Sequence, residues 1–392
     1  MEYTPREWSG GERRQSRGFR WLALLLFLLF LLVGSLLAKN YQHLGNLLRV
    51  LVLVKTQYLH PVSTGTLVDG AMQGIVDALD DPYSVYLDAR TFKQLQEQIR
   101  GSFGGLGILV GLKNNQLTVV RTYENTPAFE NGIQPGDVIA KIDQHDARGM
   151  DLETAVQLMR GPVGSKVHLS IIRPGRAEPL DLTITRQEIS VPTVQSRILD
   201  QEAGIGYLAI AQFTEKTAEE VEQALQKLQK EGLKALVLDL RDNPGGELRS
   251  AVHVAGYFVP PGPVVYIQYR GGQEDELKAE GQPLRLPLVV LVNGNSASAA
   301  EILAGAIKDR GTGRLVGEKT FGKGVVQTVF NLSDGAGLKL TTARYLTPGR
   351  HDINKKGIQP DIIVEQAPGA AVDRQLEKAR QLLQEKLVRP AA

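Results

Sequence analysis

The stretch P-L-V-V-L-V-N-G-N-S-A-S-A-A-E-I-L-A-G-A-I-K, residues 287–308, decides the fold of its part of the chain. Its first part, Pro287–Val292, is a short apolar run typical of a strand that is buried on both faces. Its second part, Ala297–Lys308, has the pattern of a helix. A strand that passes directly into a helix indicates an α/β arrangement. The junction holds Ser296 and Ser298, where free N–H groups and the helix dipole favour negative charge, although the same position also suits a serine that only caps the helix.

Further α/β elements are expected on both sides of this stretch. Apolar runs predict strands over Ile205–Ala209 and Ala235–Leu240, and an amphipathic pattern predicts a helix over Thr217–Gln229 between them. Residues Ala370–Val388 are expected to form a terminal helix. The α/β pattern therefore extends from about Ser190 to the end of the chain.

Two glycine-containing stretches in this region are candidates for chemistry. D-L-R-D-N-P-G-G, Asp239–Gly246, follows a strand, and its uncovered N–H groups can stabilise an oxyanion, although an ordinary turn fits this segment equally well. In G-E-K-T-F-G-K-G-V-V-Q, Gly317–Gln327, glycines flank Lys323. Most lysines are solvated, and a lysine base must lose about three pKa units from roughly 10.4, which burial can cause. If the chain is extended here, Gln327 lies on the same face and holds the amine.

A β-rich region precedes the α/β region and begins at a glycine-rich turn. The turn G-S-F-G-G-L-G-I, Gly101–Ile108, leaves N–H groups uncovered that can bind an anion. Short apolar runs follow it as far as about Arg186, and one helix, capped by Asp151 and closed by Gly161-Pro162, interrupts them. No G-K-S/T motif follows the glycines, so a nucleotide loop is not indicated.

The N-terminal part predicts a membrane segment followed by helices. The uncharged run Trp21–Ala38 is marginal but sufficient to span a bilayer, which takes about 20 apolar residues. Arginines dominate the preceding charges, so the residues before it are expected to stay in the cytoplasm and residues 40–392 outside it. A cleaved signal peptide ending at Ala38 is the alternative, and the bulky Leu36 favours an uncleaved anchor. Residues 40–100 are expected to be mainly helical and to serve packing or oligomerisation.

Composition excludes several classes of site. The chain has no cysteine, so disulfides, thiolate metal sites and a cysteine nucleophile are excluded. A formal net charge of +2 gives no reason to expect a nucleic acid partner. The sequence contains no H-E-x-x-H motif, so a metalloprotease is not indicated, and no cofactor is expected. His253, the histidine nearest the glycine turn, is expected to be a core or surface residue rather than a member of a catalytic triad.

The glycine-rich turn and the segments after it resemble a PDZ domain over residues 101–186. The resemblance rests on the turn, on N-T-P-A at 125–128 and on G-I-Q-P-G-D-V-I at 132–139. PDZ domains add a peptide strand to their sheet and bind its terminal carboxylate. The resemblance implies that the carboxylate-binding loop consists of Gly105, Leu106, Gly107 and Ile108.

Taken together, the motifs resemble the carboxyl-terminal processing proteases, which are Ser–Lys endopeptidases with an embedded PDZ domain. The resemblance covers about residues 45–366 and includes the late G-I-Q-P-D at 357–361. It implies that Ser298 is the nucleophile, Lys323 the general base and Gln327 its neighbour. The expected oxyanion donors are the N–H groups of Gly245, Gly246 and Ala299. The chain departs from the family pattern at Ala300, which replaces a serine, and at Asp242, where asparagine or glycine is commoner.

Together, the sequence patterns and the resemblance predict an α/β and α+β multidomain protein. The patterns predict its transmembrane helix and helical segment, and the resemblance implies a β-rich PDZ domain and a crotonase-like or ClpP-like protease core. The expected divisions are 1–20 (cytoplasmic tail), 21–38 (anchor or signal segment), 39–100 (helical region), 101–188 (PDZ domain), 189–366 (protease core) and 367–392 (C-terminal helix). The predicted function is C-terminal processing or degradation of extracytoplasmic proteins, with peptides bearing free C-termini and the membrane as partners. A homo-oligomer or an adaptor protein is left open. The alternatives are a membrane-tethered PDZ adaptor with a non-catalytic body and a non-protease hydrolase.

Overall fold

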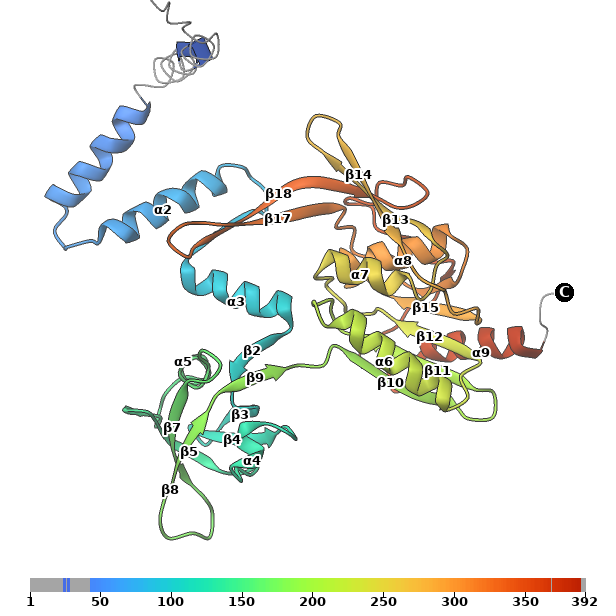
Figure 1. Ribbon diagram of the computed structural model, residues 1–392, viewed down its shortest axis with the longest axis horizontal. Coiled ribbons are helices and arrows are strands. Elements are labelled where there is room, and N and C mark those ends of the chain that lie inside the picture. The colour runs from blue at the N-terminus through green and yellow to red at the C-terminus, as the bar shows by residue number, and fades with distance from the viewer. Residues whose placement is uncertain (1–23, 26, 29–42, 368, 389–392) are drawn as a thin grey trace, which may run out of the picture. The chain divides into compact units, whose positions relative to one another are not determined.

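The computed structural model describes residues 24–25, 27–28, 43–367 and 369–388 (Figure 1). The chain divides into two compact units, with the boundary between Ala78 and Leu79. The expected membrane segment Trp21–Ala38 lies almost entirely outside the described residues. Within the described ranges, no helix is long and apolar enough to cross a membrane.

The first unit is helical where it is described. Residues 43–57 form one helix, and α2 (Thr64–Asp77) forms a second. Ser63 caps α2 by accepting a hydrogen bond from the Thr66 N–H at 3.0 Å. The helical prediction for this part of the chain is confirmed.

The second unit begins with a strand that the sequence does not reveal. β1 (Val85–Leu87) interrupts the region expected to be helical, and α3 (Ala89–Arg100) follows it. Gly101 ends α3 with a φ of 73°, a left-handed conformation that favours glycine. A run of three residues is too short to show the alternation from which a strand is predicted.

The β-rich region contains a five-strand path and a separate pair of strands. The path β3-β4-β5-β7-β8 carries β6 beside β5, and β2 pairs with β9. The elements are β2 (Ser102–Gly105), β3 (Ile108–Lys113), β4 (Gln116–Thr122), α4 (Pro127–Glu130), β5 (Val138–Ile142), β6 (His145–Asp146), α5 (Leu152–Met159), β7 (Lys166–Ile172), β8 (Leu180–Thr185) and β9 (Gln187–Ser190). The cap predicted at Asp151 is confirmed, because its carboxylate accepts the Thr154 N–H at 2.8 Å.

The α/β region is built on a six-stranded sheet in the order β10-β11-β12-β15-β16-β19, parallel except at β10. Its strands are β10 (Val194–Asp200), β11 (Ile205–Ile210), β12 (Ala235–Asp239), β15 (Leu288–Val292), β16 (Arg314–Gly317) and β19 (Ile362–Ile363). Its helices are α6 (Thr217–Lys230), α7 (Leu248–Ala255), α8 (Ala299–Asp309) and α9 (Arg374–Val388). One core packs α6, α7 and α8 on one face of the sheet, and a second core packs α9 on the other (Figure 1). The predicted alternation of strands and helices is confirmed.

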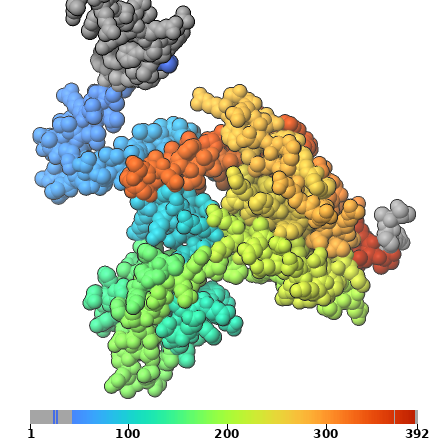
Figure 2. Space-filling view, viewed as in Figure 1, coloured from blue at the N-terminus to red at the C-terminus, as the bar shows by residue number. Residues whose placement is uncertain are grey.

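A second sheet lies beside the first, in the order β1-β18-β13-β14 with β17 paired to β18. Its remaining strands are β13 (Gly262–Tyr269), β14 (Glu274–Ala279), β17 (Val325–Asn331) and β18 (Gly337–Leu346). The Phe92 ring of α3 packs against Gly337, where a Cβ would lie 2.1 Å from the ring. The space-filling view accordingly shows α3, in cyan, against the orange β17–β18 hairpin (Figure 2). This sheet joins the start of the second unit to the segment that carries Lys323.

Candidate active site

Ser298 lies between β15 and α8 in a conformation that is rare for a residue with a side chain. Its φ and ψ angles are 55° and −116°, in a region that costs about 1–3 kcal/mol. The neighbouring Ser296 is fully buried, and its hydroxyl donates to the Leu240 carbonyl at 2.7 Å and accepts from the Asn293 N–H at 3.0 Å. Of the two serines at this junction, Ser296 therefore braces the loop, whereas Ser298 stands at the start of α8 and forms a capping box with Glu301.

Glu301, on the first turn of α8, holds the backbone of both Ser298 and Lys323. It is fully buried, and its Oε2 accepts the Ser298 N–H at 2.9 Å and the Lys323 N–H at 2.9 Å. Its Oε1 accepts the Gly322 N–H at 2.8 Å and the Thr320 hydroxyl at 2.5 Å. Four donors satisfy this buried carboxylate, which would otherwise be costly to desolvate.

Tyr345, on β18, holds the carbonyl groups of the same two residues. Its hydroxyl donates to the Ser298 carbonyl at 3.1 Å and also lies within hydrogen-bonding distance of the Lys323 carbonyl. Burial, together with the nearby Glu301, raises the pKa of Tyr345 well above its ordinary value, so that the hydroxyl remains a donor. Glu301 and Tyr345 thus fix both ends of Ser298 and of Lys323.

The Lys323 amine is half-buried and its pKa is lowered. Burial is the largest cause and the neighbouring charge of Lys339 adds to it, whereas Glu301 and Asp81 oppose it. The amine lies 4.8 Å from the centre of the Tyr83 ring. Across the described ranges, Nζ forms no hydrogen bond with Ser298 or Gln327.

Gln327 lies on β17, and its side chain is half-buried. Its Nε2 donates to the Val325 carbonyl at 3.4 Å rather than to the lysine. β17 begins only at Val325, and its pairing with β18 shifts between Val326 and Gln327. The simple alternation expected between Lys323 and Gln327 is therefore interrupted by this irregularity.

The glycine turn packs directly against the serine. A Cβ on Gly245, whose φ is 98°, would lie 2.7 Å from the Ser298 Cβ, so only glycine fits. The Gly245 N–H donates to the Asn243 side chain at 2.8 Å. The N–H groups of Gly246 and Ala299 have no acceptor in the part of the chain that the structure describes. Of the three expected oxyanion donors, the N–H groups of Gly246 and Ala299 are therefore free to donate to a substrate, whereas that of Gly245 already donates to Asn243.

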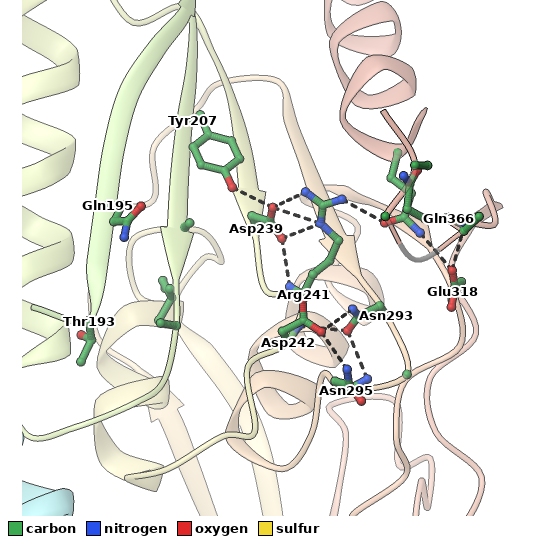
Figure 3. Close-up of a pocket in the computed structure, with 18 of the residues that line it drawn as sticks. Thr193, Gln195, Tyr207, Asp239, Arg241, Asp242, Asn293, Asn295, Glu318 and Gln366 are labelled. Carbon is green, nitrogen blue, oxygen red and sulfur yellow. Dashed lines mark hydrogen bonds and ion pairs between the residues drawn. The ribbon is translucent and has the colours of Figure 1, made fainter. Parts of the chain in front are cut away.

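Asp242, at the start of the same turn, is bound to the serine loop by side-chain amides (Figure 3). Its carboxylate accepts from Asn293 Nδ2 at 2.9 Å and from Asn295 Nδ2 at 2.8 Å. Its own N–H donates to Asn293 Oδ1 at 3.0 Å. The glycine turn and the serine loop are thereby joined on the exposed side.

The Asp239–Arg241 part of the motif is a brace rather than a catalytic group. Arg241 binds Asp239 at 2.6 Å and Asp373, just before α9, at 2.8 Å. Tyr207 donates to Asp239 at 2.8 Å (Figure 3), and burial with the nearby Asp239 raises the pKa of Tyr207 to about 12. A cavity of about 790 Å³ is bordered by this brace, and its lining includes neither Ser298 nor Lys323.

The β-rich region carries a separate apolar groove. A cavity of about 330 Å³ lies between the loop Gly105–Val110 and the apolar face of α5, which contributes Leu152, Val156 and Met159. All four residues expected in the carboxylate-binding loop line it. The N–H groups of Leu106 and Gly107 have no acceptor among the described residues. The groove can therefore hold an apolar side chain beside uncovered N–H donors.

Comparisons with known proteins agree with this layout. The profile of Peptidase family S41 matches residues 204–364, that of the PDZ domain residues 94–172, and that of the activating protease CtpB N-terminal domain residues 35–91. A carboxyl-terminal-processing protease of Synechocystis is 41% identical over 301 residues, which cover 76% of this chain and 70% of the relative. The chain belongs to the carboxyl-terminal processing protease family.

Other members of the carboxyl-terminal processing protease family match similarly. The carboxy-terminal processing protease CtpA of Bacillus subtilis is 40% identical over 314 residues, 80% of this chain and 67% of the relative. The solved structure of the photosystem II D1 C-terminal processing protease matches with a TM-score of 0.50 and 32% identity, over 91% of this chain and 96% of that chain. The present chain is therefore a serine endopeptidase with a PDZ domain.

Three residues of the site escaped the sequence reasoning: Glu301, Tyr345 and Tyr83. Glu301 had a signal, because a single carboxylate in the otherwise apolar start of α8 must find partners when buried. Tyr345 and Tyr83 had none, since each reaches the site only through strand pairing. His253 is exposed on α7, and no hydrogen bond joins it to Ser298 within the described ranges.

Proposed function

We propose that Ser298 is the nucleophile and Lys323 the general base of this serine endopeptidase. The observation that carries the proposal is the shared support of the two residues. Glu301 accepts both N–H groups, and the single hydroxyl of Tyr345 lies within hydrogen-bonding distance of both carbonyl groups. Two residues from separate segments are thus held at one place through their backbones, as a preorganised site requires.

In the proposed step, Ser298 Oγ bonds to the substrate carbonyl carbon while its proton passes to the neutral Lys323 amine. The carbonyl electron pair moves to oxygen, where the N–H groups of Gly246 and Ala299 donate hydrogen bonds. Gly245 supplies the space for this approach. Lys323 then gives the proton to the departing nitrogen as the C–N bond breaks, and water later hydrolyses the acyl group on Ser298.

Gln327 is proposed as the partner that orients the Lys323 amine once substrate is bound. Its long hydrogen bond to the Val325 carbonyl is weak, so the amide can turn toward the lysine at little cost. The lowered pKa of Lys323 supports the base role, because burial increases the fraction of neutral amine near neutral pH.

The groove between the Gly105–Val110 loop and α5 is proposed to bind the C-terminus of the substrate. The free N–H groups of Leu106 and Gly107 suit a carboxylate, and the apolar lining suits the last side chain. We further propose the domain limits 101–188 and 189–366. The uncharged run Trp21–Ala38 and the arginines before it support an anchor with the catalytic part outside the cytoplasm.

The test uses one peptide substrate made with a free C-terminal carboxylate and with a C-terminal amide. Ser298→Ala and Lys323→Ala are expected to reduce kcat to background, roughly 10⁶-fold where a nucleophile is lost. Lys319→Ala, at an exposed lysine of the same loop, is the matched control and is expected to retain activity. The amide is expected to raise KM at least about tenfold, the loss that one strong polar contact causes.

Each result distinguishes one part of the proposal. An active Lys323→Ala variant contradicts the Ser–Lys pair, whereas equal cleavage of acid and amide contradicts only terminal capture. Peptide binding without any cleavage by the wild type supports the membrane-tethered PDZ adaptor instead. Turnover of esters alone supports a non-protease hydrolase.

A further inference from the structure

The turn that precedes β1 is attached firmly to β18, the strand that carries Tyr345. In this turn the Tyr83 N–H donates to Asp81 Oδ1 at 3.1 Å, and the Ser84 hydroxyl donates to Asp81 Oδ2 at 2.5 Å. The Thr341 N–H of β18 donates to the Ser84 hydroxyl at 3.0 Å, and Ser84 is buried. Tyr83 is therefore presented to the site by hydrogen bonds to a core strand and not by a free loop.

The ring of Tyr83 faces the amine of Lys323. The 4.8 Å between Nζ and the ring centre is within the range of a cation–π contact, which acts on the charged amine alone. The other charged or titratable groups around the amine are Glu301 of α8, Asp81 of the turn, and Lys339 and Tyr345 of β18.

We propose that Tyr83 is a positioning residue that holds the protonated Lys323 amine against its ring in the substrate-free enzyme. This inference rests on the proposed role of Lys323 as the base. The ring holds the amine without a hydrogen bond to it, and the amine must lose a proton and leave the ring before it accepts the serine proton. Tyr83 thereby sets how readily the resting enzyme reaches its active protonation state.

Tyr83→Leu separates the attraction of the ring from its bulk. Leucine keeps an apolar cover over the amine but lacks the negative ring face, so burial acts on Lys323 without the opposing attraction. The acid limb of the pH profile of kcat/KM, which reports the free enzyme, is expected to move to lower pH by about half a unit to one unit. Tyr83→Phe keeps the ring and is expected to keep the limb in place.

A second series changes the charge distribution of the ring while keeping a six-membered aromatic ring at this position, with Tyr83→Phe as its reference. Phenylalanine carrying an increasing number of ring fluorines is introduced at Tyr83, since each fluorine weakens the negative ring face. The acid limb is expected to fall step by step along the series. The profiles use a peptide without ionisable side chains, so that only the enzyme titrates.

The inference is overturned if the limb stays in place or rises in Tyr83→Leu and in the fluorinated series, or if Tyr83→Phe shifts it equally. Failure of the proposed function looks different, because Lys323→Ala then remains active whatever residue stands at position 83. An inactive Lys323→Ala variant with an unmoved limb in the Tyr83 series contradicts the positioning role alone.

Discussion

Two carboxylates, Glu301 and Asp242, hold the loop that carries Ser298, and their surroundings are opposite. Glu301 is fully buried and binds backbone N–H groups of the nucleophile and of the proposed base. Asp242 is exposed and binds the side-chain amides of Asn293 and Asn295. The carboxylate of Glu301 is thus attached to the loop in the protein core, and that of Asp242 is attached to it at the protein surface.

The difference between the two concerns what can replace each carboxylate when it is removed. Water can take over the hydrogen bonds of exposed amides, so the loss of an exposed acceptor costs little. Buried N–H groups that lose their acceptor find no substitute, and each then costs about 1–3 kcal/mol. We therefore expect effects on stability and activity to fall steeply from the buried attachment to the exposed one.

The largest effect is expected from Glu301→Gln, which has nearly the same shape. A glutamine oxygen can accept at most two of the four hydrogen bonds, and its NH₂ group faces donors. The free energy of unfolding is expected to fall by about 3–5 kcal/mol, and kcat by about 10²-fold or more through misplacement of Ser298 and Lys323. Denaturant unfolding and steady-state kinetics at a temperature where the variant is folded measure both.

Glu318→Gln is the matched control for this prediction. Glu318 also accepts hydrogen bonds, from Gln366 and Gln375, but it contacts neither Ser298 nor Lys323. It is expected to change kcat little. If both glutamine variants lose activity equally, the support of the catalytic pair does not depend on Glu301 in particular.

An intermediate effect is expected from Gly245→Ala, which tests the contact behind the serine. The added Cβ would lie 2.7 Å from the Ser298 Cβ, and the alanine would have to adopt a φ of 98°. Together these effects cost about 1–3 kcal/mol. The displaced serine should lower kcat more than it changes KM. In Gly232→Ala, φ is 90° but the Cβ meets nothing within 4 Å, so strain alone remains. Equal loss of kcat in both variants contradicts a steric role for Gly245.

The contrast also explains how far the sequence could be interpreted. Ser298 and Lys323 stand in compact motifs, and strands such as β12 and β15 are continuous apolar runs, so periodicity and spacing predict them. β1 and the second sheet are not predicted, because their strands are short or half-exposed and gain their order from pairing. Tyr345 and Tyr83 enter the site through that same sheet, and no local pattern shows which distant segment a strand pairs with.

The smallest effect is expected from Asp242→Ala. Hydrogen bonds from Asn295 and Asn293 lower the pKa of Asp242 below its ordinary 3.8. A carboxyl group with a lowered pKa in the folded state adds stability above about its unfolded value, and loses it as pH falls through the folded value. Because the group is exposed, this contribution is less than about 1 kcal/mol at pH 7.

The difference in unfolding free energy between wild type and Asp242→Ala is therefore expected to shrink as the pH is lowered from 7 to below 3.8. Asp242→Asn does not titrate and is the control: its unfolding free energy should differ from that of Asp242→Ala by the same amount at both pH values. Denaturant midpoints at the two pH values measure this. A cost for Asp242→Ala as large as that of Glu301→Gln contradicts the view that burial decides the strength of the two attachments. A small cost accompanied by a large loss of kcat shows instead that Asp242 positions the oxyanion donors without stabilising the fold.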